Sequence, residues 1–269
     1  MSAPHPEKWV YQAEQEGFPE TCCSWIKGIY AAVHERNIKT VVAVQEGDCA
    51  HTHILMDILR SEGVRIIPFS YPYQHSAAKM QESLEDFAEQ FGVRLNEAEK
   101  VKQQLDIVRK KIAKLDEKTV KTGGYEKENF HFQLCSSDFN GNWQQFEHAL
   151  DAQLQAPFLP KDSPQFQLRL GLIGVPPIYT DIFEVTQRFR GRIIYNEIPR
   201  QFAMLDFSKN LVEQYLNYTY PYSVDFRIAD IQKQVELRRL DGLIHFVQAF
   251  CYRSLADILI RRTMNVPIL

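Results

Sequence analysis

Short apolar runs alternate with amphipathic segments in the first part of the chain. Apolar residues at helical spacing predict a helix over residues 25–36, and the β-branched run 40–44 predicts a buried parallel strand. A second helical pattern ends near Gly63, and a second apolar run covers residues 64–69. The order helix–strand–helix–strand with short connections is typical of a parallel α/β sheet.

The middle of the chain has a different pattern. Residues 78–120 are highly charged and helical throughout, and residues 143–154 predict a further helix. The glycine pair 123–124 separates them. One face of the long helical segment is apolar, which predicts a solvated helix packed on a neighbour. That apolar stripe consists of Val101, Leu105, Val108, Ile112 and Leu115.

The alternating pattern returns after three prolines, Pro157, Pro160 and Pro164, which indicate a stiff connection. The sequence therefore predicts an α/β protein with two Rossmann-like lobes flanking a helical insert. The expected domains are an N-terminal lobe (1–78), an insert with linker (79–163) and a C-terminal lobe (164–269). The strands expected in the last domain are 168–173, 192–195 and 243–247, with a final strand opening at 266, and its helices are 178–190, 211–215, 229–240 and 255–262.

Charge and hydropathy narrow the class of protein. The chain has 31 basic and 34 acidic residues, a net charge of -3, whereas nucleic-acid binding usually requires a basic excess. No apolar run reaches the roughly 18 residues that a membrane span needs. The N-terminus MSAPHPEKWV does not have the pattern of a secretory leader. We therefore expect a cytoplasmic protein with no nucleic-acid or membrane partner.

Cysteine positions indicate the candidate chemistry. An odd number of cysteines, five, argues against a disulfide framework. Ligands in open parallel sheets lie beyond the carboxyl ends of the strands. Cys49 and Cys251 follow predicted strands, and Cys22 and Cys23 precede a helix, where N-terminal amides favour thiolate. A zinc site using the stretch CAHTH (49–53) and an iron–sulfur site using thiolates alone are both compatible with this pattern.

Five stretches carry a resemblance to a known family: CSWIK, GDC, EQFGVRLNEAEKVKQQLDIVRKKIAKL, GLIGVPPIYTDIFEVTQRFRGRIIYNE and YSVDFRIADIQKQVELRRLDGLIHFVQAFC. In this order and spacing they resemble the iron–sulfur subunits of 2-hydroxyacyl-CoA dehydratases and benzoyl-CoA reductases, including the 2-hydroxyglutaryl-CoA dehydratase D-component. Subunits of the family are usually longer at both ends.

The resemblance implies one [4Fe-4S] cluster in the cleft between two lobes. Its ligands carry over to Cys23, Cys49 and Cys251, and Cys22 or His51 is a candidate fourth. Three thiolates leave one iron open for a water or a thioester carbonyl, as a Lewis-acid site requires. Ser24 and Arg253 flank ligands and are candidate catalytic groups beside the open iron.

The implied activity is radical dehydration of a 2-hydroxyacyl-CoA, or reduction of an acyl-CoA. One electron on the thioester carbonyl gives a ketyl radical anion, which expels the hydroxyl group and acidifies the neighbouring C–H. A separate ATP-hydrolysing iron–sulfur activator would supply the electron, and a related subunit or a second copy would complete a dimer. The alternatives are a non-catalytic electron-transfer or scaffold subunit and a zinc-binding module.

Four residues are expected to have structural roles. Arg227 is expected in a surface ion pair rather than on a CoA phosphate, and Ser24 is expected to cap a helix. His245, inside an apolar strand, is expected to be a satisfied core histidine. Cys135, in the insert, is expected to be structural.

Overall fold

The computed structural model describes residues 6–157, 166–205 and 210–269. The chain forms two compact units, each built from three segments. Unit 1 contains residues 1–100, 209–222 and 248–254, and unit 2 contains residues 101–208, 223–247 and 255–269.

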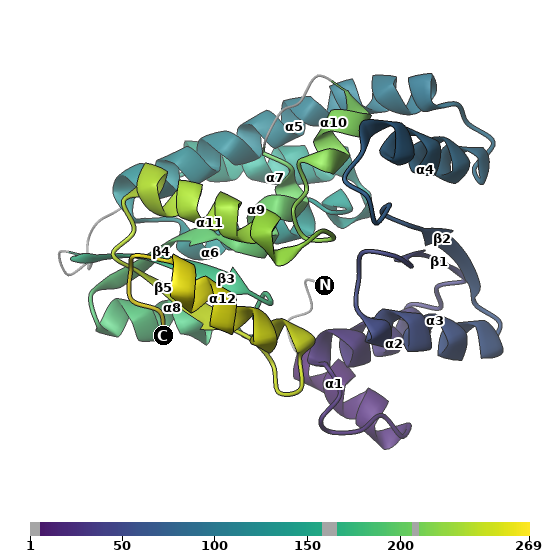
Figure 1. Cartoon of the computed structure of the whole chain (residues 1–269), viewed down its shortest axis with the longest axis horizontal. Helices are drawn as coiled ribbons and strands as arrows, with labels where there is room; N and C mark the ends of the chain where they lie inside the picture. Colours follow the sequence, from purple (N-terminus) through teal and green to yellow (C-terminus); the bar gives the residue numbers. More distant parts are fainter. Residues whose placement is uncertain (1–5, 158–165, 206–209) are drawn as a thin grey trace. The chain divides into compact units, whose positions relative to one another are not determined.

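Unit 1 is built on a two-stranded parallel sheet, in which Thr40 pairs with Arg65 and Val44 with Phe69. Helices α2 and α3 lie on one face of the sheet with α1 outside them, and α4 contacts β2 from the other side together with α10 (Figure 1). The bounds are α1 (Pro6–Gln15), α2 (Ser24–Glu35), β1 (Thr40–Val44), α3 (Ala50–Ser61), β2 (Arg65–Phe69), α4 (Ala77–Glu89) and α10 (Leu211–Leu216).

The core of unit 1 follows from helical periodicity. Ile26, Tyr30 and Val33 of α2 are buried, and so are Leu55 and Leu59 of α3. Positions three or four residues apart lie on the same face of a helix, so each helix presents one apolar stripe to the other and to the sheet. The segment 210–222 belongs to the same unit because its tyrosines pack on Tyr71, which is 7% exposed.

Gly47 fixes the loop that follows β1. Its φ is +90°, and a Cβ atom there would lie 2.6 Å from the Cβ atom of Pro221 and 2.9 Å from that of Tyr71. Only glycine adopts this conformation readily and leaves room for such a close approach. The loop that leads to Cys49 is therefore held against both segments by backbone packing.

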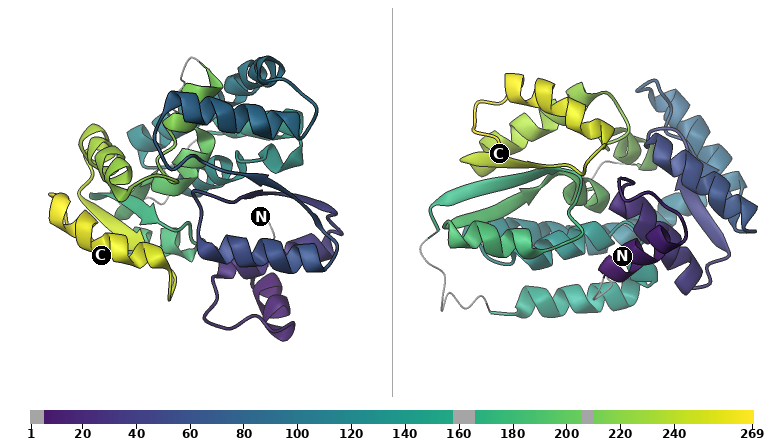
Figure 2. Two further views of the ribbon diagram at one scale, coloured as in Figure 1. Left: turned by 45° about the vertical axis from the view of Figure 1, so that its right-hand side comes forward. Right: turned by 90° about the horizontal axis from the view of Figure 1, so that it is seen from below.

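Unit 2 contains a three-stranded parallel sheet in the order β4–β3–β5. Helices α11 and α12 pack on one face of the sheet, and α6 and α8 pack on the other (Figures 1 and 2). The bounds are α6 (Glu126–Cys135), η1 (Phe139–Gly141), α7 (Trp143–Gln155), β3 (Leu168–Gly174), α8 (Asp181–Arg188), β4 (Gly191–Asn196), α9 (Glu197–Ala203), α11 (Val224–Arg238), β5 (Gly242–Phe246) and α12 (Asp257–Thr263). The long helix α5 (Leu95–Thr122) begins in unit 1 and continues into unit 2, and the short helix η2 (Tyr252–Ala256) likewise spans both.

Unit 2 buries three arginine–carboxylate ion pairs. The most deeply buried pair is Arg227–Glu197, in which both side chains are 1% exposed. The Nε atom of Arg227 lies 2.6 Å from Oε1 of Glu197. The prediction of a surface ion pair for Arg227 was therefore wrong about its location, because a carboxylate 30 residues away lies beside it in the core. The other two pairs are Arg238–Asp116 at 2.6 Å and Arg192–Glu126 at 2.8 Å.

The predicted fold class is confirmed as a mixed α/β chain with two parallel sheets. All five internal strands lie within a residue or two of their predicted positions, because short apolar runs identify buried strands well. The predicted helical stretch 78–120 is interrupted at residues 90–94. Residues 266–269 contribute only an isolated parallel bridge from Ile268 to Leu243 rather than a strand.

The predicted proline connection falls largely within residues 158–165, which lie outside the described residues. Within the described parts of the chain, no helix combines the length and apolar character needed to cross a membrane.

Candidate functional site

Two helices of unit 1 begin at a cysteine. Cys23 is the N-cap residue of α2, and Cys49 is the N-cap residue of α3. The first amides of a helix have no partner within the helix and carry partial positive charge, which favours a negatively charged group in front of them. The structure therefore explains why both cysteines stand where a helix begins.

Cys251 lies in the turn after β5 and belongs to unit 1 together with the other candidate thiols. The turn is compact, since Cys251 donates its N–H to the carbonyl of Gln248 at 3.1 Å and accepts the N–H of Ser254 at 3.0 Å. The side chain of Gln248 accepts the backbone N–H of Ser24 at 2.7 Å. This bond ties the segment that carries Cys251 to the start of α2, beside Cys23.

The three thiols predicted as ligands interact electrostatically. Burial raises the pKa of the Cys23 thiol, the N–H groups of Ile26 and Trp25 lower it in part, and Cys49 and Cys251 raise it. Thiols affect one another in this way only when their sulfur atoms lie in one neighbourhood. The structure thus brings the loops of Cys23, Cys49 and Cys251 together.

Cys22 has a different environment from Cys23. Its side chain packs against the apolar core between α2 and α3. Burial raises the pKa of the Cys22 thiol, which the positive charge of Lys27 offsets in part. Cys22 is therefore placed toward the interior of the helical layer of unit 1.

The loop between β1 and α3 is held by Asp48. One oxygen of its carboxylate accepts the N–H of Cys49 at 2.8 Å, and the other accepts the hydroxyl of Thr52 at 2.9 Å. The hydroxyl of Thr52 also lies 3.7 Å from the sulfur atom of Cys49. These contacts fix the orientation of the Cys49 side chain at the start of the helix.

Arg253 is a buried cation near the thiols. Its side chain stacks on Tyr220, with 3.6 Å between the guanidinium carbon and the ring centroid, and lies 5.1 Å from the ring of Tyr252. The residue is 6% exposed, and its Nε atom has no hydrogen-bond partner among the described residues. No described carboxylate forms an ion pair with it. Burial raises the pKa of Tyr252, Arg253 lowers it in part, and Cys49 and Cys251 raise it further. The guanidinium and the two thiols therefore lie in one region.

Within residues 6–157, 166–205 and 210–269, no group of three or more His, Cys, Asp or Glu side chains is arranged to hold a metal ion. His51 and His53 both lie in the first turn of α3 and are exposed. A four-iron cluster places its thiolates on separate irons, so its ligands need not converge on one point.

The donor set fits such a cluster in its chemistry. Iron–sulfur clusters are held by thiolates, and Cys23, Cys49 and Cys251 supply three from one neighbourhood. Two of them stand at helix N-termini, and a buried arginine lies nearby, which together favour a negatively charged group.

Three other predicted residues have clear positions. Ser24 is the first residue of α2 rather than its cap, so the capping prediction was wrong, because Cys23 occupies the cap position. The Nδ1 atom of His245 lies 2.7 Å from Asp257, while its buried Nε2 atom has no partner among the described residues. Cys135 is 4% exposed in the apolar core of unit 2.

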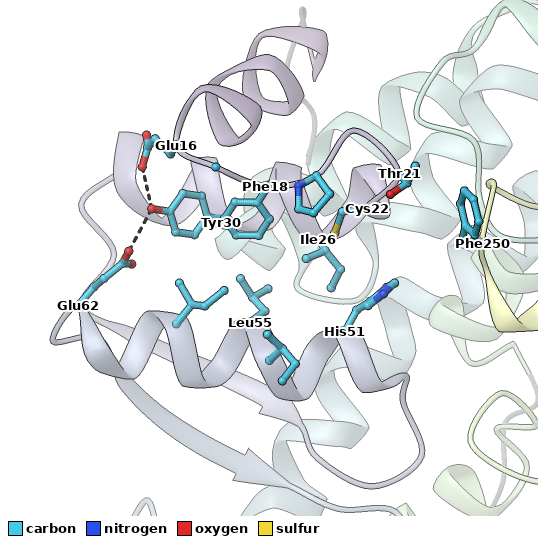
Figure 3. A pocket seen from close by; sticks show the side chains of 14 residues that line it. Glu16, Phe18, Thr21, Cys22, Ile26, Tyr30, His51, Leu55, Glu62 and Phe250 are labelled. Carbon is cyan, nitrogen blue, oxygen red and sulfur yellow. Dashed lines mark hydrogen bonds between the residues drawn. The ribbon is translucent and has the colours of Figure 1, made fainter.

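An elongated cavity of about 570 Å³ adjoins the thiol loops within unit 1. Figure 3 shows Cys22, His51 and Phe250 at one end and Tyr30 with Glu16 and Glu62 at the other. The sequence does not reveal this cavity or the bridging role of Gln248. Both depend on contacts between segments more than 200 residues apart, and the only sequence signal is the proximity of Gln248 and Phe250 to Cys251.

Parallel sheets, thiols at helix starts and a cavity beside their loops define a mixed α/β protein with a cysteine-containing candidate site. The family model of the 2-hydroxyglutaryl-CoA dehydratase D-component matches residues 5–269. The chain therefore belongs to this family, whose members are components of radical 2-hydroxyacyl-CoA dehydratases. A search of curated proteins finds no match.

Proposed function

We propose that this chain is the iron–sulfur subunit of an ATP-activated radical 2-hydroxyacyl-CoA dehydratase. The observation that carries the proposal is the grouping of Cys23, Cys49 and Cys251, which come from three separate loops, in a family of dehydratase components. These residues would hold a [4Fe-4S] cluster. When bound, the cluster supplies one electron for the thioester and one iron without a protein thiolate.

The residues around the thiols have distinct roles in this proposal. Gln248 holds the Cys251 turn against the start of α2 through its bond to the N–H of Ser24. Asp48 and Thr52 orient Cys49. Arg253 supplies a positive charge on a side chain that is itself 6% exposed, so its charge interactions are screened less than those of a surface arginine.

A catalytic subunit is favoured over a pure electron carrier by the cavity. A carrier needs a cluster that is closed to small molecules, whereas a dehydratase must admit an acyl chain beside it. The cavity of about 570 Å³ lies within the size range of small-molecule sites. Cys22 and His51, the candidate fourth ligands, both line this cavity.

A partner and an activator complete the proposal. Each catalytic cycle would begin with an electron from a separate ATP-hydrolysing protein and would return that electron after water is lost, so that no net reductant is consumed. A related subunit or a second copy of the chain would form the working dimer.

The test is anaerobic reconstitution with iron and sulfide, followed by metal analysis and paramagnetic resonance. We expect about four irons and four sulfides per chain, in line with a cubane cluster. Single changes of Cys23, Cys49 or Cys251 to Ala should abolish cluster retention, and Cys135→Ala, in the core of unit 2, should retain it. Full iron content in all three ligand variants would refute the assignment.

A separate measurement tests whether the proposed cluster contacts the substrate. Addition of an acyl-CoA to the reduced, reconstituted chain should change the paramagnetic spectrum if the open iron meets a thioester. An unchanged spectrum at saturating acyl-CoA would favour the electron-carrier role.

A further inference from the structure

We propose that one end of the cavity binds an organic ammonium ion, with the apolar body of the ligand lying along the cavity. Tyr30, Glu16 and Glu62 form this end, called the acidic end from here on, and Cys22 and His51 line the opposite end (Figure 3). The proposed function concerns only the end with Cys22 and His51. The acidic end is a separate binding site, for a ligand that is not a thioester.

Two carboxylates share one phenol at the acidic end. The hydroxyl of Tyr30 lies 2.7 Å from Oε2 of Glu16 and 3.1 Å from Oε1 of Glu62. A phenol has one proton and can donate it to only one carboxylate at a time. The two side chains therefore present more accepting oxygen atoms than Tyr30 can satisfy.

The other neighbours of the two carboxylates leave this accepting capacity in place. Gln12 donates a side-chain N–H to Oε1 of Glu16 at 3.2 Å, and Nε2 of His34 lies 2.9 Å from Oε2 of Glu62. An ionised carboxylate can accept about four hydrogen bonds, so each has room for another donor. Neither lysine nor arginine is among the described residues that line the cavity.

The acidic end favours a positively charged ligand group. Hydrogen bonds from Tyr30 and Gln12 lower the pKa of Glu16, so this carboxyl is ionised at neutral pH. Glu62 is the C-cap residue of α3, where the helix dipole adds negative potential. His34 is a cation only when protonated, so a ligand cation would improve the balance of charge.

Aromatic rings favour an organic cation over a metal ion. Phe18 and Tyr30 both line the cavity, with their ring centroids 4.6 Å apart. The electron-rich faces of aromatic rings attract ammonium groups. In the described parts of the chain, no group of three or more His, Cys, Asp or Glu side chains is arranged to hold a metal ion, and the acidic end is no exception.

The wall beside the acidic end suits an apolar ligand body. On α3, Leu55, Ile58 and Glu62 lie three and four residues apart, so they share one face of the helix. From Leu55 to Glu62 that face rises about 10 Å, at 1.5 Å per residue. Ile26 of α2 lines the cavity as well. An amine with an aliphatic or phenyl body would therefore bury apolar surface while its ammonium group meets the carboxylates.

Calorimetry on the full-length chain with three ligands of similar shape tests the proposal. The ligands are 3-phenylpropylamine, 3-phenylpropan-1-ol and 3-phenylpropanoate, whose head groups are positive, neutral and negative. We expect the amine to bind about tenfold more tightly than the alcohol, because a charge-assisted bond to a carboxylate adds to the burial of the phenyl group. The negatively charged ligand should bind most weakly. Equal affinities for the amine and the alcohol, or tightest binding of 3-phenylpropanoate, would overturn the proposal.

Variants locate the ammonium group at the acidic end. The double change Glu16→Gln and Glu62→Gln keeps groups that can bond to Tyr30 but removes both charges, so the amine should bind only as tightly as the alcohol. Glu62→Gln alone, which changes one partly exposed side chain, should reduce the preference for the amine in part. Glu82→Gln removes an exposed carboxylate of α4 outside the cavity and should leave the preference unchanged. Wild-type preference in variants shown to be folded by circular dichroism would contradict the proposal.

Preparations with and without the proposed cluster separate this site from the thiol site. We expect the same amine affinity in both, because the two carboxylates lie at the end of the cavity opposite Cys22 and His51. Binding of the amine only to the reconstituted chain would place its nitrogen at the metal and overturn the proposal. Selective amine binding by a chain that retains no iron would support this inference and count against only the cluster.

Discussion

The two units differ in the partners of their buried arginine side chains. In unit 2, Arg192, Arg227 and Arg238 are each buried, and each forms an ion pair with a carboxylate at 2.6 to 2.8 Å. In unit 1, Lys27 is paired with Glu14, but Arg253 is buried against tyrosine rings without an ion pair to a described carboxylate. The buried arginines of unit 2 are therefore balanced by carboxylates, whereas the buried charge of Arg253 in unit 1 is not balanced by a described carboxylate.

The central strand layer of unit 2 and the cavity of unit 1 differ in how far their apolar side chains are buried. Every residue of β4 in unit 2 is buried, between helices on both faces of its sheet. In unit 1, Ile54 and Phe250 stay exposed along a cavity. Exposed apolar side chains gathered at one cavity indicate a ligand surface.

The prediction with the largest expected effect concerns the buried ion pair of unit 2 between Arg227 and Glu197. Glu197→Gln leaves Arg227 charged and buried, since both side chains are 1% exposed. We expect the free energy of unfolding to fall by about 3–5 kcal/mol, the usual cost of breaking a buried ion pair. Urea denaturation measures it. Asp57→Asn, which breaks an exposed pair with Arg60, is the control and should change little.

The second prediction concerns the loop before Cys49. Gly47→Ala adds a Cβ atom 2.6 Å from Pro221 at a φ of +90°. We expect a loss of about 2 kcal/mol, because overpacking adds to the backbone strain. The loss should be accompanied by reduced iron retention. Gly92→Ala, at a φ of +66° with no atom within 4 Å, is the matched control, for which about 1 kcal/mol and normal iron content are expected.

The third prediction distinguishes Arg253 from the arginines of unit 2. Arg253→Met removes a buried cation without leaving a buried carboxylate unpaired, although it loses the stacking on Tyr220 and the bond to the Tyr220 carbonyl, so the cluster-free chain should lose about 1–2 kcal/mol in stability. In the reconstituted chain, loss of a nearby positive charge should make the reduction potential more negative. The expected shift is about 40 mV, for an interaction of about 1 kcal/mol. A stability loss as large as that of Glu197→Gln, with an unchanged potential, would assign Arg253 to the scaffold.

The smallest expected effect is a pH dependence in unit 2. Burial raises the pKa of Asp257, but the contacts with His245 and Arg261 outweigh it and hold the pKa below its usual range. A carboxylate with a lowered pKa in the folded state adds stability above its unfolded pKa of about 4, and this stability is lost as pH falls through the folded value. The advantage of the wild type over Asp257→Asn, below about 1 kcal/mol at pH 7, should shrink progressively as pH falls below about 4 in acid titrations of stability. An advantage that grows on acidification would contradict this sign.

The strands were predictable from sequence, and several helices were not. Apolar runs such as residues 40–44 identify buried parallel strands directly. Helix α6 buries Glu126, Asn129 and Gln133, whose side chains bond to polar partners in distant segments. Such a helix has no run of apolar residues at helical spacing, so the sequence pattern did not predict α6. Helices α1 and α9 were not predicted either. Local pattern cannot reveal burial that depends on a distant partner.

The places of the candidate thiols at element ends were predictable from the sequence, but their surroundings were not. The positions of Cys23, Cys49 and Cys251 were expected from element ends and from the family resemblance. Arg253 was singled out as a neighbour of Cys251, yet its burial against Tyr220 depends on a segment about 30 residues away. The cavity likewise needs the register of two helices, which sequence spacing alone does not fix.

The bond from Ser24 to Gln248 spans 224 residues of sequence. At the usual rate of synthesis, 5–20 residues per second, roughly 11–45 seconds separate the emergence of its two ends from the ribosome. Through that interval Cys251 is missing from the surroundings of Cys23 and Cys49. Assembly of the proposed three-cysteine site would thus be a late event in the life of a nascent chain, and a stalled or shortened product would lack its last member.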